Sequence, residues 1–209
     1  MNKADIDYRL YLVTDRETLR GRDLCQAIEQ AILGGVTLVQ LREKSVSTRE
    51  FVELALAVKE ITTRYKIPLI INDRLDIALA IDADGLHIGQ DDMPMLTARK
   101  LFGSDKIIGV SASTLEESLL AEKQGADYLG IGAMVATPTK TDAKIVTFEE
   151  LAQIKKSVNI PIVAIGGIHT WNAREMMSSG IDGLSVVSAI LAPDDIQGAA
   201  RELLQIISD

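Results

Sequence analysis

The chain has 209 residues, of which 47% are hydrophobic and 25% charged, an ordinary composition for a soluble globular protein. This composition excludes long disorder, collagen-like repeats and a disulfide scaffold, and the length favours one domain over two. The 22 basic and 30 acidic residues give a formal net charge of −8, which repels nucleic acid and anionic lipid. An anionic substrate would therefore need a local cluster of basic side chains.

Two features of the sequence bear on the cellular compartment. The single cysteine, Cys25, cannot form an intrachain disulfide, and it lies in a helix-like run where a small buried or half-buried filler is expected rather than a nucleophile. We expect no signal peptide within the first ten residues and, without a run of about 18 apolar residues, no membrane span. We therefore expect a cytoplasmic protein that binds neither membrane nor nucleic acid; a homo-oligomer is compatible with the sequence.

A short apolar run followed by a longer stretch of helical periodicity recurs along the chain. The runs are rich in Val, Ile and Leu and predict strands buried on both faces. They are residues 8–14, 38–42, 69–73, 85–89, 107–111, 128–132, 162–166 and 183–187. Between them, Thr48, Thr114 and Thr147 are expected to cap helices, the last two with a glutamate at the capping-box spacing.

Eight strand–helix units predict an α/β fold, a (β/α)8 TIM barrel formed as a single domain by residues 1–209. A doubly wound parallel sheet is the alternative. It usually has fewer strands and a Gly-x-Gly-x-x-Gly turn after the first one, where this chain has Val13-Thr14-Asp15-Arg16. In a barrel, the active site collects at the carboxyl ends of the strands, which are unusually polar here.

Basic residues follow the second apolar run. Gln40, Arg42 and Lys44 alternate with Leu41 and Glu43, so they would share one face if the strand extended that far. Arginine can hold a phosphate through two hydrogen bonds, and lysine supplies a movable point charge. The pattern favours a site for an anionic ligand. The alternative is a solvated strand end paired with nearby acids.

Two aspartates end neighbouring runs of the predicted barrel. Asp73 and Asp92 could share one cation, since adjacent strands lie about 4.8 Å apart. Carboxylates, together with water and phosphate oxygens, are typical Mg²⁺ ligands. Helix capping is the alternative, with Asp73 capping a helix that starts near Leu75, and Asp91 or Asp92 one near Pro94.

Later segments have features of phosphate sites. Residues 137–141 hold three threonines and a lysine around one proline, groups that together can wrap a phosphate. Gly166 and Gly167 would let backbone N–H groups approach a ligand, and with Ser188 they follow strands seven and eight, where barrels often bind phosphate.

The two histidines and the tryptophan are predicted to have structural roles. His87 lies inside an apolar run and is expected to be a hydrogen-bonded core or rim residue, while His169 is expected in an exposed loop. Trp171 is expected to pack near the start of the helix after the seventh strand. The sequence contains no Cys/His cluster that would indicate zinc.

Taken in order, the motifs resemble those of the thiamine phosphate synthases, which join the pyrimidine and thiazole halves of thiamine. The matching segments are Tyr11-Leu12-Val13-Thr14-Asp15, Gln40-Leu41-Arg42-Glu43-Lys44, Ile71-Asn72-Asp73-Arg74, 85–92, Gly109-Val110-Ser111, Thr137-Pro138-Thr139-Lys140, Ile165-Gly166-Gly167-Ile168 and Val187-Ser188. Two departures are alanines at 133 and 136, where many members have proline, and Ser113, near which many have histidine.

The resemblance implies a barrel that binds two small-molecule substrates, hydroxymethylpyrimidine diphosphate and hydroxyethylthiazole phosphate, together with Mg²⁺. The residues implied for the pyrimidine substrate are Gln40, Leu41, Arg42, Glu43, Lys44, Asn72, Ser111 and Lys140. Those implied for the thiazole phosphate are Thr137, Thr139, Gly167, Val187 and Ser188. Asp73 and Asp92 match the metal ligands, and Arg42, Lys44 and Lys140 are implied as catalytic.

The resemblance also implies a dissociative reaction. The diphosphate leaves a benzylic-type carbon of the pyrimidine, and the thiazole nitrogen captures the resulting cation. Two alternatives remain open at this stage: an isomerase like the thiazole tautomerases, which share the barrel, and a non-catalytic barrel that binds a phosphate ligand.

Overall fold

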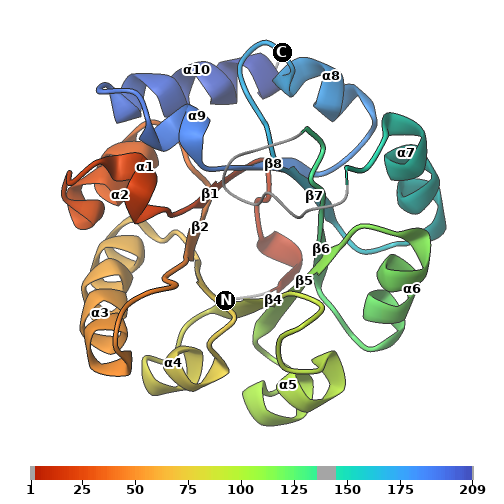
Figure 1. Cartoon of the computed structure of the whole chain (residues 1–209), viewed down its shortest axis with the longest axis horizontal. Helices are drawn as coiled ribbons and strands as arrows, with labels where there is room; N and C mark the ends of the chain where they lie inside the picture. Colours follow the sequence, from red (N-terminus) through yellow and green to blue (C-terminus); the bar gives the residue numbers. More distant parts are fainter. Residues whose placement is uncertain (1–2, 136–144, 209) are drawn as a thin grey trace.

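Eight parallel strands close into a barrel, and helices surround it on the outside (Figure 1). The computed structural model describes residues 3–135 and 145–208. The strands are β1 Leu10–Val13, β2 Leu38–Leu41, β3 Leu69–Asn72, β4 Gly85–Ile88, β5 Ile107–Ala112, β6 Tyr128–Ile131, β7 Ile162–Ile165 and β8 Gly183–Val186. Each strand pairs with the next, and β8 pairs with β1. The predicted (β/α)8 barrel is confirmed, and the doubly wound alternative is wrong because the sheet has no edge.

The helices follow the strands in alternation and form the outer layer. They are α1 Arg16–Leu19, α2 Leu24–Leu33, α3 Thr48–Tyr65, α4 Leu75–Ala80, α5 Met95–Phe102, α6 Leu115–Lys123, α7 Phe148–Ser157, α8 Ala173–Ser178, α9 Ser188–Leu191 and α10 Ile196–Ser208, and a short 3-10 helix, η1, spans Lys3–Asp5. The last helix, α10, packs against α2 and so closes the outer layer. Among the described helices, none is long and apolar enough to cross a membrane.

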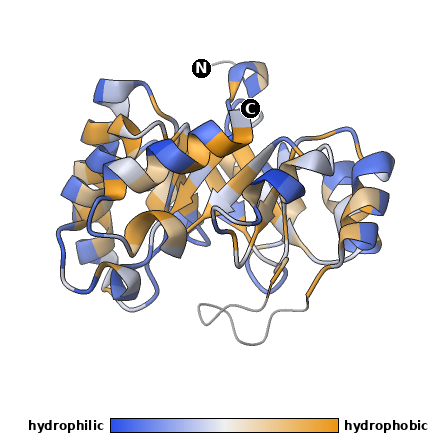
Figure 2. Cartoon of the chain, turned by 90° about the horizontal axis from the view of Figure 1, so that it is seen from above, coloured by the Kyte–Doolittle hydropathy of each residue, from blue (hydrophilic) through white to orange (hydrophobic). Residues whose placement is uncertain are grey.

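The barrel has two apolar cores, because side chains alternate between the two faces of each strand. The larger core lies between the sheet and the helices, whose hydrophilic residues lie toward the outside (Figure 2). The smaller core fills the barrel interior and consists of Tyr8, Tyr11, Leu38, Ile70, Ile107, Tyr128 and Val163. We call this second set the interior cluster.

Most of the predicted helix starts are confirmed, and one is wrong by a residue. Thr114 and Thr147 cap α6 and α7, each in a capping box. The N-cap of α3 is Ser47 rather than Thr48. Ser47 Oγ accepts a hydrogen bond from the backbone N–H of Glu50, and the Glu50 carboxylate accepts one from the backbone N–H of Ser47. Because Glu50 occupies the third position of the helix in this capping box, the N-cap is the residue three positions before it, Ser47.

The amino ends of the strands are joined by a repeated contact. The residue just before each even-numbered strand accepts a hydrogen bond from a backbone N–H at the start of the preceding odd-numbered strand. The four pairs are Thr37 with Leu10 (3.1 Å), Asp84 with Leu69 (2.9 Å), Asp127 with Ile108 (2.7 Å) and Asp182 with Ile162 (2.8 Å). We call the four acceptors the amino-end ring.

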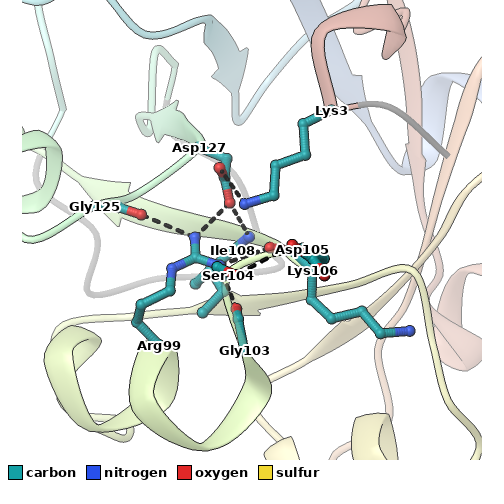
Figure 3. Close-up of polar contacts among 9 residues, drawn as sticks. All are labelled: Lys3, Arg99, Gly103, Ser104, Asp105, Lys106, Ile108, Gly125 and Asp127. Carbon is teal, nitrogen blue, oxygen red and sulfur yellow. Dashed lines mark hydrogen bonds and ion pairs between the residues drawn. The ribbon is translucent and has the colours of Figure 1, made fainter.

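Asp127 is the most connected member of the amino-end ring (Figure 3). Its carboxylate also binds Arg99 Nη2 at 2.5 Å and Lys3 Nζ at 2.9 Å. Arg99 in turn donates to the carbonyls of Gly103 and Gly125. One side chain therefore ties η1, α5 and β5 together at the end of the barrel opposite the strands' carboxyl ends.

The prediction that Trp171 packs against the fold is wrong. Trp171 is 73% exposed and stacks on the half-buried ring of His169, with centroids 5.8 Å apart. The interior side of this turn is filled by Asn172, whose side chain accepts from the His169 N–H and donates to the Gly167 carbonyl. Cys25 is half-buried and forms no disulfide, as expected.

Candidate functional site

A cavity of about 400 Å³ opens at the carboxyl ends of the strands. Residues from all eight strands line it, among them Val13, Gln40, Asn72, His87, Ser111, Gly130, Ile165 and Ser185. Sequence alternation explains this lining, because the same strand faces that hold the interior cluster become polar toward their carboxyl ends. The cavity therefore has a polar floor, and the apolar interior cluster lies beneath that floor.

The polar floor is hydrogen-bonded across the barrel. Gln40 is only 4% exposed, and its Nε2 donates to Tyr11 Oη at 2.7 Å. The His87 ring contacts Ser111 Oγ through Nε2 and Tyr128 Oη through Nδ1, each at 2.9 Å. His87 is thus hydrogen-bonded, as predicted, and it lines the cavity.

Arg42 and Lys44 lie in the loop after β2, because the strand ends at Leu41. Arg42 lines the cavity, and its backbone N–H donates to Thr14 Oγ1 at 2.9 Å, which fixes the start of the loop against β1. Lys44 is more exposed and pairs with Asp73, with 2.5 Å between Nζ and Oδ2. The predicted pairing of basic residues with acids therefore holds for Lys44.

Two members of the matched motif point away from the cavity. Leu41 is fully buried in the core between sheet and helices. The Glu43 carboxylate is 4% exposed and accepts a hydrogen bond from Arg16 Nε at 2.7 Å. Gln40 faces inward, so the alternation of the strand turns Leu41 outward. Leu41 and Glu43 hold the loop in place, while Gln40 and Arg42 line the cavity.

Asp73 and Asp92 lie side by side at the rim of the cavity. Burial raises the pKa of Asp92 above the usual value for an aspartic acid, and its hydrogen-bonding contact with Asp73 raises it further. Asp92 Oδ2 also accepts from the N–H of Gly89, which lines the cavity, at 2.7 Å. Asp73 has a left-handed backbone, with φ of 61°, a costly conformation that is common at functional sites.

The capping alternative for these aspartates is wrong. The N-cap residue of α4 is Arg74 and that of α5 is Pro94, so neither aspartate occupies the N-cap position. The two carboxylates are instead engaged by Lys44 and by the Gly89 N–H. The carboxylates of Asp73 and Asp92 therefore face one another rather than the helix ends.

The two carboxylates at this rim suit a Mg²⁺ ion whose other ligands come from water and a bound substrate. Mg²⁺ commonly binds one or two carboxylates and completes its octahedron with water and substrate phosphates. Within residues 3–135 and 145–208, His, Cys, Asp and Glu side chains form no group of three or more that could hold a metal ion. Asp73 and Asp92 could supply two ligands to such an ion, with water or phosphate oxygens at its other positions.

The predicted phosphate end of the site lies on the opposite side of the cavity. Gly167, Val187 and Ser188 line it together. Gly167 has a φ of 67°, and a Cβ there would lie 2.4 Å from Val135 Cβ, so only glycine fits. The predicted contacts Thr137, Thr139 and Lys140 lie outside the described residues.

Several cavity-lining residues were not assigned to the site from the sequence, among them Ser185, Gln90 and Glu117. Ser185 is 3% exposed and faces the cavity from β8, where its alternation with Leu184 could have predicted an inward position. Gln90 lines the rim and donates to the Ser111 carbonyl at 2.6 Å. Glu117 also reaches the lining, although its carboxylate is occupied by the capping box of α6.

Comparison with known proteins gives a consistent result. The family model described as thiamine monophosphate synthase matches residues 10–190. The thiamine-phosphate synthase of Clostridium acetobutylicum is 60% identical over 203 residues, which cover 97% of this chain and 96% of that protein. The chain belongs to the thiamine monophosphate synthase family. The resemblance inferred from the ordered motifs is therefore confirmed.

Other similar proteins extend the comparison. The thiamine-phosphate synthase of Ruminiclostridium cellulolyticum is 54% identical over 204 residues, covering 98% of this chain and 97% of that protein. The structure of the thiamine phosphate pyrophosphorylase from Pyrococcus furiosus matches with a TM-score of 0.89 at 41% identity, covering 97% of this chain and 96% of that one. This structure resembles the barrel described here along nearly its whole length.

Proposed function

We propose that the protein condenses hydroxymethylpyrimidine diphosphate with hydroxyethylthiazole phosphate to give thiamine phosphate and pyrophosphate, a step of thiamine diphosphate biosynthesis. The observation that carries this proposal is the 60% identity to a thiamine-phosphate synthase over nearly the whole chain. The polar cavity at the carboxyl ends of the strands supports it, because Arg42, Asn72 and Ser111 line that cavity as the resemblance implies.

The basic residues would act on the leaving diphosphate. Negative charge builds on that group as the C–O bond to the pyrimidine carbon breaks. Arg42 and Lys44 would therefore bind it more strongly in the transition state than in the ground state, which is the condition for catalysis. Mg²⁺, when bound at Asp73 and Asp92, would supply further positive charge for the same group. The expected third cation is Lys140.

The reaction needs no protein nucleophile. The amino group of the pyrimidine donates electron density to the cationic carbon, and the thiazole nitrogen then forms the new C–N bond. The one cysteine, Cys25, lies in α2 and does not line the cavity. Gly167, Val187 and Ser188 would hold the thiazole phosphate and so aim the nitrogen at the carbon while excluding water.

The setting of the reaction follows from the substrates. Both are small molecules, so neither nucleic acid nor a membrane is needed. We place the reaction in the cytoplasm, because the lone cysteine fits a reducing compartment. The alternatives, a thiazole tautomerase and a silent phosphate-binding barrel, would require neither a diphosphate substrate nor pyrophosphate release.

A coupled assay of pyrophosphate release, with both substrates and with or without Mg²⁺, tests the proposal. We expect release only when both substrates and Mg²⁺ are present. Arg42→Gln should lower turnover by roughly 10²–10³-fold, the usual effect of removing one such group. Arg74→Gln is the matched control, since Arg74 pairs with the exposed Asp76 next to the same rim. Wild-type protein that releases no pyrophosphate would refute the proposed function.

Metal binding is tested separately with Asp73→Asn. The variant should need a much higher Mg²⁺ concentration for half-maximal activity, whereas Asp76→Asn should not. Lys140→Ala should fold normally and lose most activity. An unchanged Mg²⁺ titration in Asp73→Asn would show that Asp73 serves only to pair with Lys44.

A further inference from the structure

A continuous hydrogen-bonded chain of five side chains crosses the barrel beneath the cavity. It runs from Gln40 to Tyr11 (2.7 Å), Tyr128 (2.7 Å), His87 (2.9 Å) and Ser111 (2.9 Å). Gln40 and Ser111, on β2 and β5, line the cavity together with His87, and the two tyrosines lie in the interior cluster. Neither tyrosine is among the residues that the sequence or the resemblance assigned to the site. We call this chain the interior relay.

The interior of the barrel is shaped to hold this relay. A Cβ at Gly109 would lie 2.1 Å from Cζ of Tyr128, and one at Gly130 would lie 3.2 Å from Cε1 of His87. Tyr11 is 1% exposed and Tyr128 is fully buried. Burial raises the pKa of Tyr128 well above the usual value for tyrosine, so its hydroxyl is a neutral donor. Water does not compete for these hydroxyls.

The relay has a definite sense, by which we mean the direction of hydrogen-bond donation along it, because each tyrosine hydroxyl has one hydrogen to donate. Gln40 Nε2 donates to Tyr11 Oη, and the acceptor within the described residues for the Tyr11 hydrogen is Tyr128 Oη, so we assign the Tyr11 hydrogen to that bond. With its oxygen accepting from Tyr11, Tyr128 has Nδ1 of His87 as the acceptor for its own hydrogen, which selects the tautomer of His87. That nitrogen accepts, so the ring hydrogen is on Nε2, which donates to Ser111 Oγ.

The sense of the relay sets what each end offers to a ligand. Ser111 Oγ already accepts from His87, and within the described residues this is its one side-chain hydrogen bond. Its own hydrogen is then available to an acceptor atom in the cavity. At the other end, the Gln40 amide is held with its nitrogen on Tyr11. If the direction of donation were reversed, the Ser111 hydroxyl would donate to His87 and could only accept a hydrogen bond from a ligand. The Gln40 amide would then turn over, so that its oxygen accepts from Tyr11.

We propose that His87, Tyr128 and Tyr11 are positioning residues that fix Ser111 as a hydrogen-bond donor to the pyrimidine substrate while holding the amide of Gln40. This inference rests on the proposed function for the identity of the substrate. The relay itself is a property of the protein without ligand. The site would thus favour a ligand with an acceptor atom, such as a ring nitrogen or a diphosphate oxygen, at Ser111.

Nitrogen NMR of the histidine rings tests the relay without any activity. The chain has two histidines, so His169→Gln identifies the signals of His87. We expect the neutral ring with hydrogen on Nε2 and a hydrogen-bonded, unprotonated Nδ1. In Tyr128→Phe, the Nδ1 signal should lose the signature of an accepted hydrogen bond. A hydrogen on Nδ1 in the wild-type protein would overturn the proposal.

Steady-state kinetics test the consequence for substrate binding. Tyr128→Phe should raise KM for the pyrimidine diphosphate about tenfold, the effect of about 1.4 kcal/mol from a broken hydrogen bond, and change KM for the thiazole phosphate less than twofold. Tyr8→Phe is the matched control, because the Tyr8 ring packs 5.1 Å from that of Tyr128 and its hydroxyl stands outside the relay. Equal effects of the two variants would show that the tyrosines contribute only by packing, which would overturn the proposal.

A conservative variant separates positioning from shape. In His87→Gln, the amide nitrogen can take the place of Nε2 and donate to Ser111, so its pyrimidine KM should stay closer to wild type than that of His87→Ala. The reverse order would overturn the positioning role. If the wild-type protein shows the expected ring form yet releases no pyrophosphate, the relay stands and the proposed function fails.

Discussion

Replacing Asp127 by alanine removes the most connected contact at the amino end of the barrel. The carboxylate accepts from the Ile108 N–H at 2.7 Å and pairs with Arg99 and Lys3. Its side chain is 19% exposed, so water replaces these contacts only in part. The variant therefore tests how much stability arises at the end of the barrel away from the cavity.

The expected loss of stability can be worked from these contacts. A hydrogen bond from a backbone N–H to a charged group contributes about 1.5–3 kcal/mol. The two ion pairs are partly exposed and together add about 1 kcal/mol. The free energy of unfolding should therefore fall by about 3 kcal/mol. For a chain of this size, each kcal/mol lowers Tm by about 2–4 °C, so Tm should fall by about 6–12 °C.

Thermal and urea unfolding of matched variants check this value. Asp105→Ala is the control, because Asp105 is exposed and binds only the neighbouring Ser104 hydroxyl among the described residues. Asp127→Asn should fall between the two, since an amide oxygen can still accept from Ile108 without the charge. Activity at low temperature should be unchanged. A Tm for Asp127→Ala equal to that of Asp105→Ala would refute the reasoning.

Three further predictions concern other parts of the fold. Gly109→Ala should destabilise the protein by about 2 kcal/mol or more, measured by urea unfolding, because its Cβ would overlap the Tyr128 ring. Ser47→Ala should cost about 1 kcal/mol by the same assay and Thr48→Ala less, since Ser47 caps α3. Burial raises the pKa of Cys25, so its alkylation at pH 8 should be slower than that of a free thiol and should accelerate as the pH rises; an equal rate would contradict this assignment.

The fold was predictable because its signals are local. Short apolar runs and helical periodicity alternate along the chain, and each needs only a few neighbouring residues to be recognised. The strand ends were predicted too long, as at Arg42 and Asp73, because polar residues can continue the chain after the pairing with neighbouring strands has stopped. Where a strand ends depends on its partners, which the local pattern does not contain.

The candidate site was predictable only in part, for the same reason. Barrel topology brings the carboxyl ends of all strands together, so Arg42, Asn72 and Ser111 could be placed at one cavity before the structure was known. The contact between Tyr11 and Tyr128 spans 117 residues, and no sequence period joins them. The outward direction of Glu43 likewise depends on Arg16, 27 residues earlier.

The amino-end ring has a consequence for how the chain assembles. Its four hydrogen bonds close loops of 15, 19, 20 and 27 residues between consecutive strands. The three shorter loops each hold one helix, and the longest holds α1 and α2. Closing loops this short costs little chain entropy, so each strand–helix–strand pair can form before the barrel closes. Circular permutants opened between pairs, such as between β4 and β5, keep every such loop contiguous. They should refold faster than permutants opened between β5 and β6, where one loop is cut.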